Sequence, residues 1–382
     1  MKTRPQIRRA MLALLTVLLL FAAGCRQQLW VYQDEFKNLL LQVDWRQYDR
    51  DKALYPHSPD PEGMTVWFYP ADGSKGYRHT TTEVNRYEAY LAQGDYVALL
   101  MDYSPEEYGR QEFLGMDYAS TAKVQSKPDP YQPARLGPLY DSEAYFSELM
   151  SKEPTGNWTV SCQPEPIATD VRDMNVPFGR YANYVPYEER DSYQASLMQY
   201  SYSFTPMLIP RKMRVRIPVK GIYYMYQLEG SVAGLADGWI LVENHSSDDP
   251  CLMALNDWEV YATGENEGYI AITFNTWGLR NRLWSSYDLF GDKPFLVDAG
   301  EANLRFNLRF LLRDRQSVCC FHIDAGNQVY VFPNEYALSV DLRGVLSGDK
   351  IPTLPYVEAA NGVDLGGVVV PWEDGADVNV NF

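Results

Sequence analysis

Several segments of this chain alternate apolar and polar residues with a period of two, the pattern of a half-buried β-strand. The clearest segments are residues 304–310, 213–219 and 378–382. Their apolar positions are Leu304, Phe306, Leu308 and Phe310; Met213, Val215, Ile217 and Val219; and Val378, Val380 and Phe382. A helix would space its apolar residues about 3.6 positions apart, so these segments predict antiparallel strands.

The N-terminal half contains further predicted strands at residues 39–45, 64–69 and 96–101, separated by turn-forming segments such as residues 58–63 and 71–73. Composition favours the same structure, because the 29 Tyr, 15 Phe and 9 Trp residues suit strands and the 26 Gly and 24 Pro suit turns. The sequence therefore predicts an all-β protein.

The length of 382 residues exceeds one small sandwich and suits two domains. Residues 163–190 are rich in Pro, Asp, Glu and Tyr and lack periodicity, as expected of a connection between domains. We therefore predict a leader at 1–24, an N-terminal domain with this connection at 25–190, and a C-terminal domain at 191–382.

The first 25 residues have the pattern of a bacterial lipoprotein signal. A basic segment precedes an apolar run at residues 11–23, and small residues then lead to Cys25. The basic residues are Lys2, Arg4, Arg8 and Arg9. We predict cleavage before Cys25 and lipidation of its sulfur; the alternatives are an ordinary signal peptide or an N-terminal anchor helix.

Lipidation of Cys25 would tether the chain to a membrane, since two acyl signals suffice for stable attachment. Loss of residues 1–24 leaves 30 basic against 50 acidic residues, a net charge near −20. This balance argues against nucleic acid as a partner and against a basic patch on anionic lipid.

The remaining cysteines are Cys162, Cys251, Cys319 and Cys320. Disulfides are chemically possible outside the inner membrane, but neighbouring strand residues such as the last two point to opposite faces. Buried free thiols are the favoured state, and the disulfide state stays open.

The sequence offers few signs of catalysis. The four histidines, His57, His79, His245 and His322, form no HExxH or HxH pattern. Acidic pairs at residues 248–249 and 373–374 do not have EF-hand spacing. We therefore predict no catalytic, metal or cofactor-binding residues, no cofactor and no enzyme activity.

Two tyrosine-rich segments, residues 181–202 and 222–226, suit core or interdomain packing. Tyrosine also combines an apolar face with a hydroxyl, so a partner interface or glycan binding are alternatives.

Several motifs together resemble the fimbrillin-like lipoproteins of Bacteroidales, which include fimbrial anchors and minor subunits and belong to a branch largely of uncharacterised function. The motifs are LQVDW at 41–45, PEGMTVWFYP at 61–70, AQGDY at 92–96, YYMY at 223–226, VAGL at 232–235, NTWGL at 275–279 and GVVVPWE at 367–373. The resemblance implies two tandem transthyretin-like antiparallel β-sandwich domains tethered to the outer membrane. The cell surface is the favoured location, and the periplasmic face is the alternative.

The resemblance also implies a structural or adhesive lipoprotein, an anchor or accessory subunit that contacts fimbrial subunits or other surface proteins by β-strand addition. In such families an anchor keeps its first strand, whereas polymerising subunits are cut after a basic residue nearby. Arg46 and Arg50 follow the first predicted strand here, and solvated loop residues are the favoured interpretation. The alternative function is a glycan-binding surface lipoprotein that serves nutrient uptake.

Overall fold

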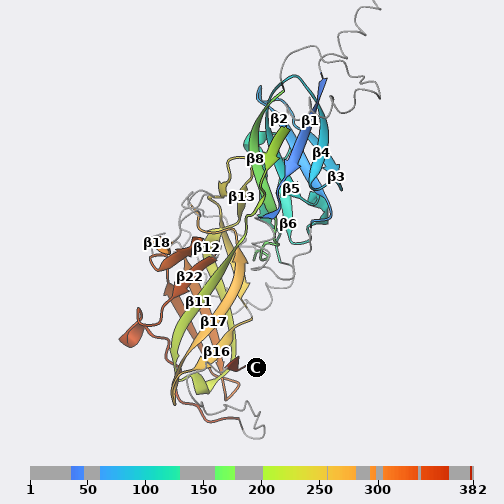
Figure 1. Ribbon diagram of the computed structural model, residues 1–382. Coiled ribbons are helices and arrows are strands. Elements are labelled where there is room, and N and C mark those ends of the chain that lie inside the picture. Colours follow the sequence, from blue (N-terminus) through green and yellow to red (C-terminus); the bar gives the residue numbers. More distant parts are fainter. Residues whose placement is uncertain are drawn as a thin grey trace, which may run out of the picture.

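The chain forms two elongated lobes built from β-sheets (Figure 1). The computed structural model describes residues 36–46, 61–129, 160–176, 201–255, 257–280, 293–297, 304–333, 337–360 and 379–380. Apart from strands, the regular elements of these residues are short 3-10 helices, which confirms the all-β prediction. These helices are η1 (Pro105–Glu107), η2 (Ala119–Thr121), η5 (Ile222–Tyr224) and η9 (Gly348–Lys350).

The N-terminal lobe packs two sheets face to face. The β1 sheet has the order β4 (Arg86–Ala92), β1 (Phe36–Val43), β9 (Ser201–Phe204). The β5 sheet has the order β10 (Met207–Leu208), β8 (Ala168–Val176), β5 (Gly94–Asp102), β2 (Met64–Pro70), β3 (Tyr77–Thr81). One apolar cluster between these sheets includes the fully buried Leu39, Leu41, Val66, Phe68 and Leu100.

The C-terminal lobe also packs two sheets. The β12 sheet has the order β15 (Pro250–Leu255), β12 (Met225–Ala236), β19 (Arg305–Leu312), β20 (Val318–Asp324). The β11 sheet has the order β18 (Phe295–Val297), β21 (Val329–Phe332), β22 (Ala337–Asp341), β11 (Arg211–Lys220), β17 (Glu267–Thr276), β16 (Glu259–Ala262), β23 (Asn379–Val380). The alternation predicted at 213–219 and 304–310 is confirmed, because every apolar residue named there is buried.

A small sheet joins the two lobes. This junction sheet has the order β14 (His245–Ser246), β13 (Gly238–Ile240), β7 (Lys123–Ser126), β6 (Gln111–Leu114). Its central pair, β7 and β13, brings together strands from the two halves of the chain. The buried Trp277 donates from Nε1 to the hydroxyl of Ser126 at 2.9 Å. One apolar cluster consequently runs from Trp67 and Leu99 on the β5 sheet into the C-terminal lobe.

Most pairs among the described strands are antiparallel, as predicted, and two are parallel: β1 with β9, and β11 with β22. The predicted boundary between residues 190 and 191 lies outside the described residues. The nearest described strands on its C-terminal side, β9 and β10, pair with the β1 and β5 sheets of the N-terminal lobe. These pairings favour a boundary between Leu208 and Arg211. Phe382 also lies outside the described residues, whereas the backbone of β23 pairs with β16.

Candidate functional site

The first strand occupies the centre of the β1 sheet. β1 pairs antiparallel with β4, which sets Leu39 opposite Ala89, and parallel with β9, which sets Leu41 beside Tyr202. Both leucines are fully buried against the β5 sheet. Because neighbouring strands hold β1 on both sides, its removal would open a slot lined with apolar residues and unpaired backbone groups.

The chain leaves β1 through an exposed turn at Asp44 and Arg46. Arg46 donates from Nε to Oδ1 of Asp44 at 2.9 Å, and its side chain is 88% exposed. Hydrogen bonds from Arg46 lower the pKa of Asp44 to about 2. Arg46 is thus the solvated surface residue favoured by the sequence analysis, and Arg50 lies outside the described residues.

The C-terminal lobe presents an open sheet edge at β20. This strand ends the β12 sheet and pairs with β19 from Val318↔Leu311 to Asp324↔Arg305. Within the part of the chain that is described, no strand pairs with its outer edge. Its sequence, VCCFHID, contains none of the Lys, Arg or Pro residues that commonly protect edge strands.

The side chains of β20 alternate between the core and the surface. Phe321 packs inward, edge to face against Phe310 with ring centroids 5.7 Å apart. Val318 is 41% exposed and Cys320 is also exposed. A strand with one anchored face and an open backbone edge is the geometry that β-strand addition requires.

Other long edges are better protected. β3 carries Arg78, which binds Glu106, and β4 carries Arg86 and Glu88. The opposite edge of the β12 sheet, β15, is covered where the backbone of Ser161 donates to Leu252 at 2.7 Å. Among the described edges, β20 is therefore the most accessible long one.

A partly buried polar cluster lies at the junction sheet. Lys123 Nζ lies 3.2 Å from Asp237 and 2.9 Å from Asp249, and Ser247 donates to Asp237 at 2.5 Å. Burial raises the pKa of Asp237, which the serine and lysine partly oppose. The acidic pair at 248–249 thus contributes to an ion pair between the two halves of the chain, and residues 373–374 lie outside the described part.

A second buried carboxyl belongs to Asp102 at the end of β5. Its Oδ1 accepts hydrogen bonds from the Tyr108 hydroxyl and the Ala168 backbone N–H, both at 2.8 Å. Complete burial raises the pKa of Asp102 to about 7 despite these donors. The group lies beside the core cluster that connects the lobes, so it bears on stability more directly than on binding.

The cysteines and histidines of the described residues belong to several different elements, and only Cys319 and Cys320 are neighbours in the chain. Cys251 is buried, whereas Cys162, Cys319 and Cys320 are partly or fully exposed, and all four are free thiols. This corrects the prediction that all four are buried. His79, His245 and His322 contact Tyr87, Glu243 and Asn307 respectively. No group of three metal-binding side chains occurs within the described ranges. Cys25 and His57 lie outside them.

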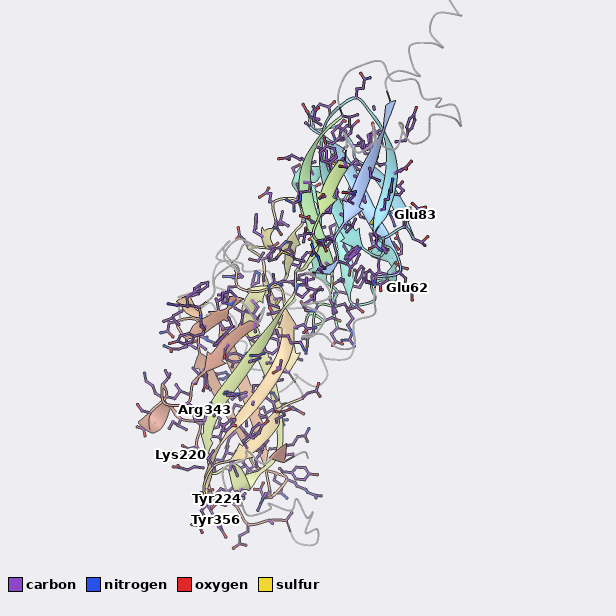
Figure 2. The ribbon with its side chains drawn as sticks, viewed as in Figure 1. Glu62, Glu83, Lys220, Tyr224, Arg343 and Tyr356 are labelled. Carbon is purple, nitrogen blue, oxygen red and sulfur yellow. The ribbon has the colours of Figure 1, made fainter. Side chains whose placement is uncertain are left out.

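The tyrosine-rich segments differ. Residues 181–200 lie outside the described part, but Tyr202 packs on the N-terminal lobe, where its hydroxyl lies 2.6 Å from the carbonyl of Asn175. Tyr224 meets the 70% exposed Tyr356 edge to face at 5.3 Å. Figure 2 places this pair at the end of the C-terminal lobe far from the N-terminal lobe. An aromatic contact is thus partly exposed there.

Sequence reasoning missed a row of basic side chains along β11. Lys212, Arg214, Arg216 and Lys220 alternate with the buried apolar residues of this strand and so share its outer face. The alternation itself was the available signal, but net charge argued against a basic surface.

In the described residues no helix is long and apolar enough to cross a membrane.

The chain resembles known proteins in sequence and in fold. The family model described as a domain of unknown function, DUF5119, matches residues 24–256. No curated protein sequence matches. A candidate adhesin from Bacteroides ovatus superposes with a TM-score of 0.51 at 13% identity, over 84% of this chain and 93% of that chain.

Two further solved structures share less of the geometry. A candidate adhesin from Bacteroides thetaiotaomicron gives a TM-score of 0.40 at 10% identity, over 76% of this chain and 80% of its own. The fimbrial anchor protein Mfa2 from Porphyromonas gingivalis gives 0.33 at 10% identity, over 75% and 81%. This chain and the Bacteroides ovatus protein therefore share a fold. The DUF5119 family model matches more than half of the sequence, so the chain belongs to the DUF5119 family.

Proposed function

We propose that this protein is an outer-membrane lipoprotein, anchored through Cys25 at the cell surface, with a structural or adhesive role. In this proposal it is a fimbrillin-like anchor or accessory subunit that binds a fimbrial or other surface protein by β-strand addition. The observation that carries the proposal is the open edge of β20 on a fold shared with a candidate adhesin.

The position of β1 supports an anchor or accessory role in preference to a polymerising one. Leu39 and Leu41 fill the core of the N-terminal lobe, and burial of each leucine contributes about 2 kcal/mol. Loss of β1 would therefore remove a large part of a typical folding free energy of about 5–15 kcal/mol. A chain that keeps β1 has a complete N-terminal lobe and binds through another edge.

The lipid anchor is tested by labelling cells with radioactive palmitate. The wild-type chain should incorporate the label and fractionate with the outer membrane, and a Cys25→Ser variant should do neither. Protease treatment of intact cells then tests orientation, since a surface protein is digested and a periplasmic one is protected. Unlabelled wild-type protein would refute the anchor.

The binding edge is tested by substituting lysine on β20. Val318→Lys and Cys320→Lys place charges beside the open backbone edge, where a lysine discourages pairing with another strand. Thr273→Lys makes the same change at an exposed site inside the β11 sheet and serves as the matched control. Partners that co-purify with the wild-type lipoprotein should be lost from both edge variants and retained by the control. Retention by the edge variants would refute strand addition at β20.

A further inference from the structure

The polar cluster at the junction sheet places one amine between two carboxyl groups. Lys123 Nζ on β7 lies 3.2 Å from Oδ2 of Asp237 and 2.9 Å from Oδ2 of Asp249. The side chains of Lys123 and Asp237 are only 15% and 21% exposed, whereas that of Asp249 is 73% exposed. The amine thus contacts one carboxyl that is largely shielded from water and one that is open to it.

Backbone hydrogen bonds hold the three side chains of this contact in place. The N–H of Ser126 donates to the carbonyl of Asp237 at 2.9 Å, and the N–H of Asp237 donates to the carbonyl of Asp249 at 3.0 Å. β7 and β13 pair directly, with Lys123 opposite Ile240. The amine and the carboxyl groups are therefore preorganised. Groups held together in this way can react as if each were present at about 10⁵ M or more.

The surroundings of Asp237 favour its neutral, protonated form. Burial raises the pKa of Asp237, and the hydroxyl of Ser247 and the charge of Lys123 oppose this only in part. Ser247 donates to Oδ1 of Asp237 at 2.5 Å, which polarises the carbonyl and would stabilise an oxyanion at that atom. A protonated carboxyl with a polarised carbonyl can be attacked by an amine, whereas an ionised carboxylate resists attack.

Asp249 is placed to take a proton from the amine. Burial lowers the pKa of Lys123, but the hydrogen bonds and charges of Asp249 and Asp237 outweigh burial and raise the pKa overall. The amine is therefore protonated most of the time and needs a base before it can attack. Direct proton transfer to Asp249 is possible, because the two atoms are 2.9 Å apart.

We propose that Lys123 and Asp237 condense into an intramolecular amide bond. Asp249 accepts one proton from Nζ, and the free amine attacks Cγ of Asp237. The bond between Nζ and Cγ forms, and the bond between Cγ and its hydroxyl oxygen breaks. The hydroxyl leaves as water with a second proton from the nitrogen, and Asp249 then releases its proton to solvent. The reaction consumes no oxidant and no other reactant.

This amide bond would join the two halves of the chain at the junction sheet. A pull between the two ends of the chain would pass through the bond from residue 123 to residue 237. The segment between these residues, which includes β8, β11 and β12, would then carry no load. Such a bond suits a protein that transmits force along its length. It goes beyond the proposed contact at β20, because it forms within one chain and requires no partner.

The protein contains a matched control for this chemistry in another ion pair. Lys75 Nζ lies 3.0 Å from Oδ1 of Asp117, so the same two groups meet at a similar distance. Their side chains are 66% and 59% exposed, far more than those of the junction pair. Within the described part of the chain, Lys75 has no second carboxylate that could act as a base. We therefore expect Lys75 and Asp117 to stay unlinked.

The test maps protease peptides of the full-length protein, purified from cells, by mass spectrometry under denaturing conditions. We expect one linked peptide pair that contains Lys123 and Asp237 and is lighter than the two separate peptides by one water molecule. Lys123→Arg keeps the positive charge but should give no link. Asp249→Asn should slow the appearance of the link about a hundredfold in a pulse-chase experiment, the usual effect of losing a general base.

Three outcomes would overturn the proposal. They are a wild-type protein without the linked peptide pair, a link between Lys75 and Asp117 at the same extent, and an unchanged rate of linkage in Asp249→Asn. Thermal unfolding shows whether each variant is folded. The peptide map of the wild type decides the proposal even if a variant does not fold, since both lysine–aspartate pairs are read from the same sample.

Discussion

The buried carboxyl of Asp102 should make the stability of this protein fall as the pH rises from about 4 to 7. In the unfolded chain this group titrates near its ordinary pKa of 3.8, whereas burial raises the folded pKa to about 7. Between these values the folded state holds a proton that the unfolded state has released. Rising pH therefore favours the unfolded state across this window, and above it the loss is complete.

The size of the effect follows from the two pKa values of Asp102. A difference of about three pKa units corresponds to about 4 kcal/mol, of which about 3 kcal/mol develops between pH 4.5 and pH 8. Asp102→Asn keeps an acceptor for the Tyr108 hydroxyl and the Ala168 N–H but cannot ionise. The variant should therefore gain stability relative to wild type by about 3 kcal/mol over that pH range.

Urea unfolding followed by tryptophan fluorescence measures this difference at both pH values. Asp349→Asn removes an exposed carboxyl of the same type and serves as the control, with the same pH dependence as the wild type. A wild-type and Asp102→Asn pair whose stability difference does not change with pH would show that burial does not hold the proton on Asp102.

Three further predictions concern β1 and the junction. Leu41→Ala should lower the free energy of unfolding by about 2–5 kcal/mol, because the Leu41 side chain is fully buried. Gln42→Ala should change the free energy of unfolding by less than about 0.5 kcal/mol, because Gln42 is exposed, and denaturant titration distinguishes the two variants. Gly238→Ala should destabilise the junction, because its Cβ would lie 2.2 Å from the carbonyl oxygen of Val124, and calorimetry should show a lower or divided transition; an unchanged transition would contradict this. An arginine-specific protease should cut after the exposed Arg46, and the β1 fragment should stay bound between β4 and β9. Mass spectrometry should then find one species under native conditions and two species under denaturing conditions. Release of the fragment under native conditions would contradict the account.

The sequence predicted the long strands well because local alternation determines which side of such a strand is buried. β11 and β19 show this most clearly, with Met213 and Phe306 inside and Arg214 and Asn307 on the opposite faces. The resemblance to fimbrillin-like proteins likewise predicted packed antiparallel sheets, which both lobes show, whereas the transthyretin-like identity of two tandem domains stays a prediction.

The junction sheet could not be predicted in this way. β7 and β13 are too short to show a period, and their pairing sets Val124 beside Trp239, far apart in the sequence. The parallel pair of β1 with β9 could not be predicted for the same reason, because β9 is short and lies far from β1 in the sequence. Local pattern also does not show whether a face is covered. Asn307 on the polar face of β19 is fully buried, whereas Arg216 on the polar face of β11 is exposed.

The most direct test of the proposed function places a photo-crosslinking amino acid at position 318 of the protein in intact cells. The account predicts cross-links to an extended segment of another surface protein, and none when the same amino acid replaces Thr273. Equal cross-linking from both positions, or none from position 318 in cells that bear the protein at their surface, would contradict strand addition at β20.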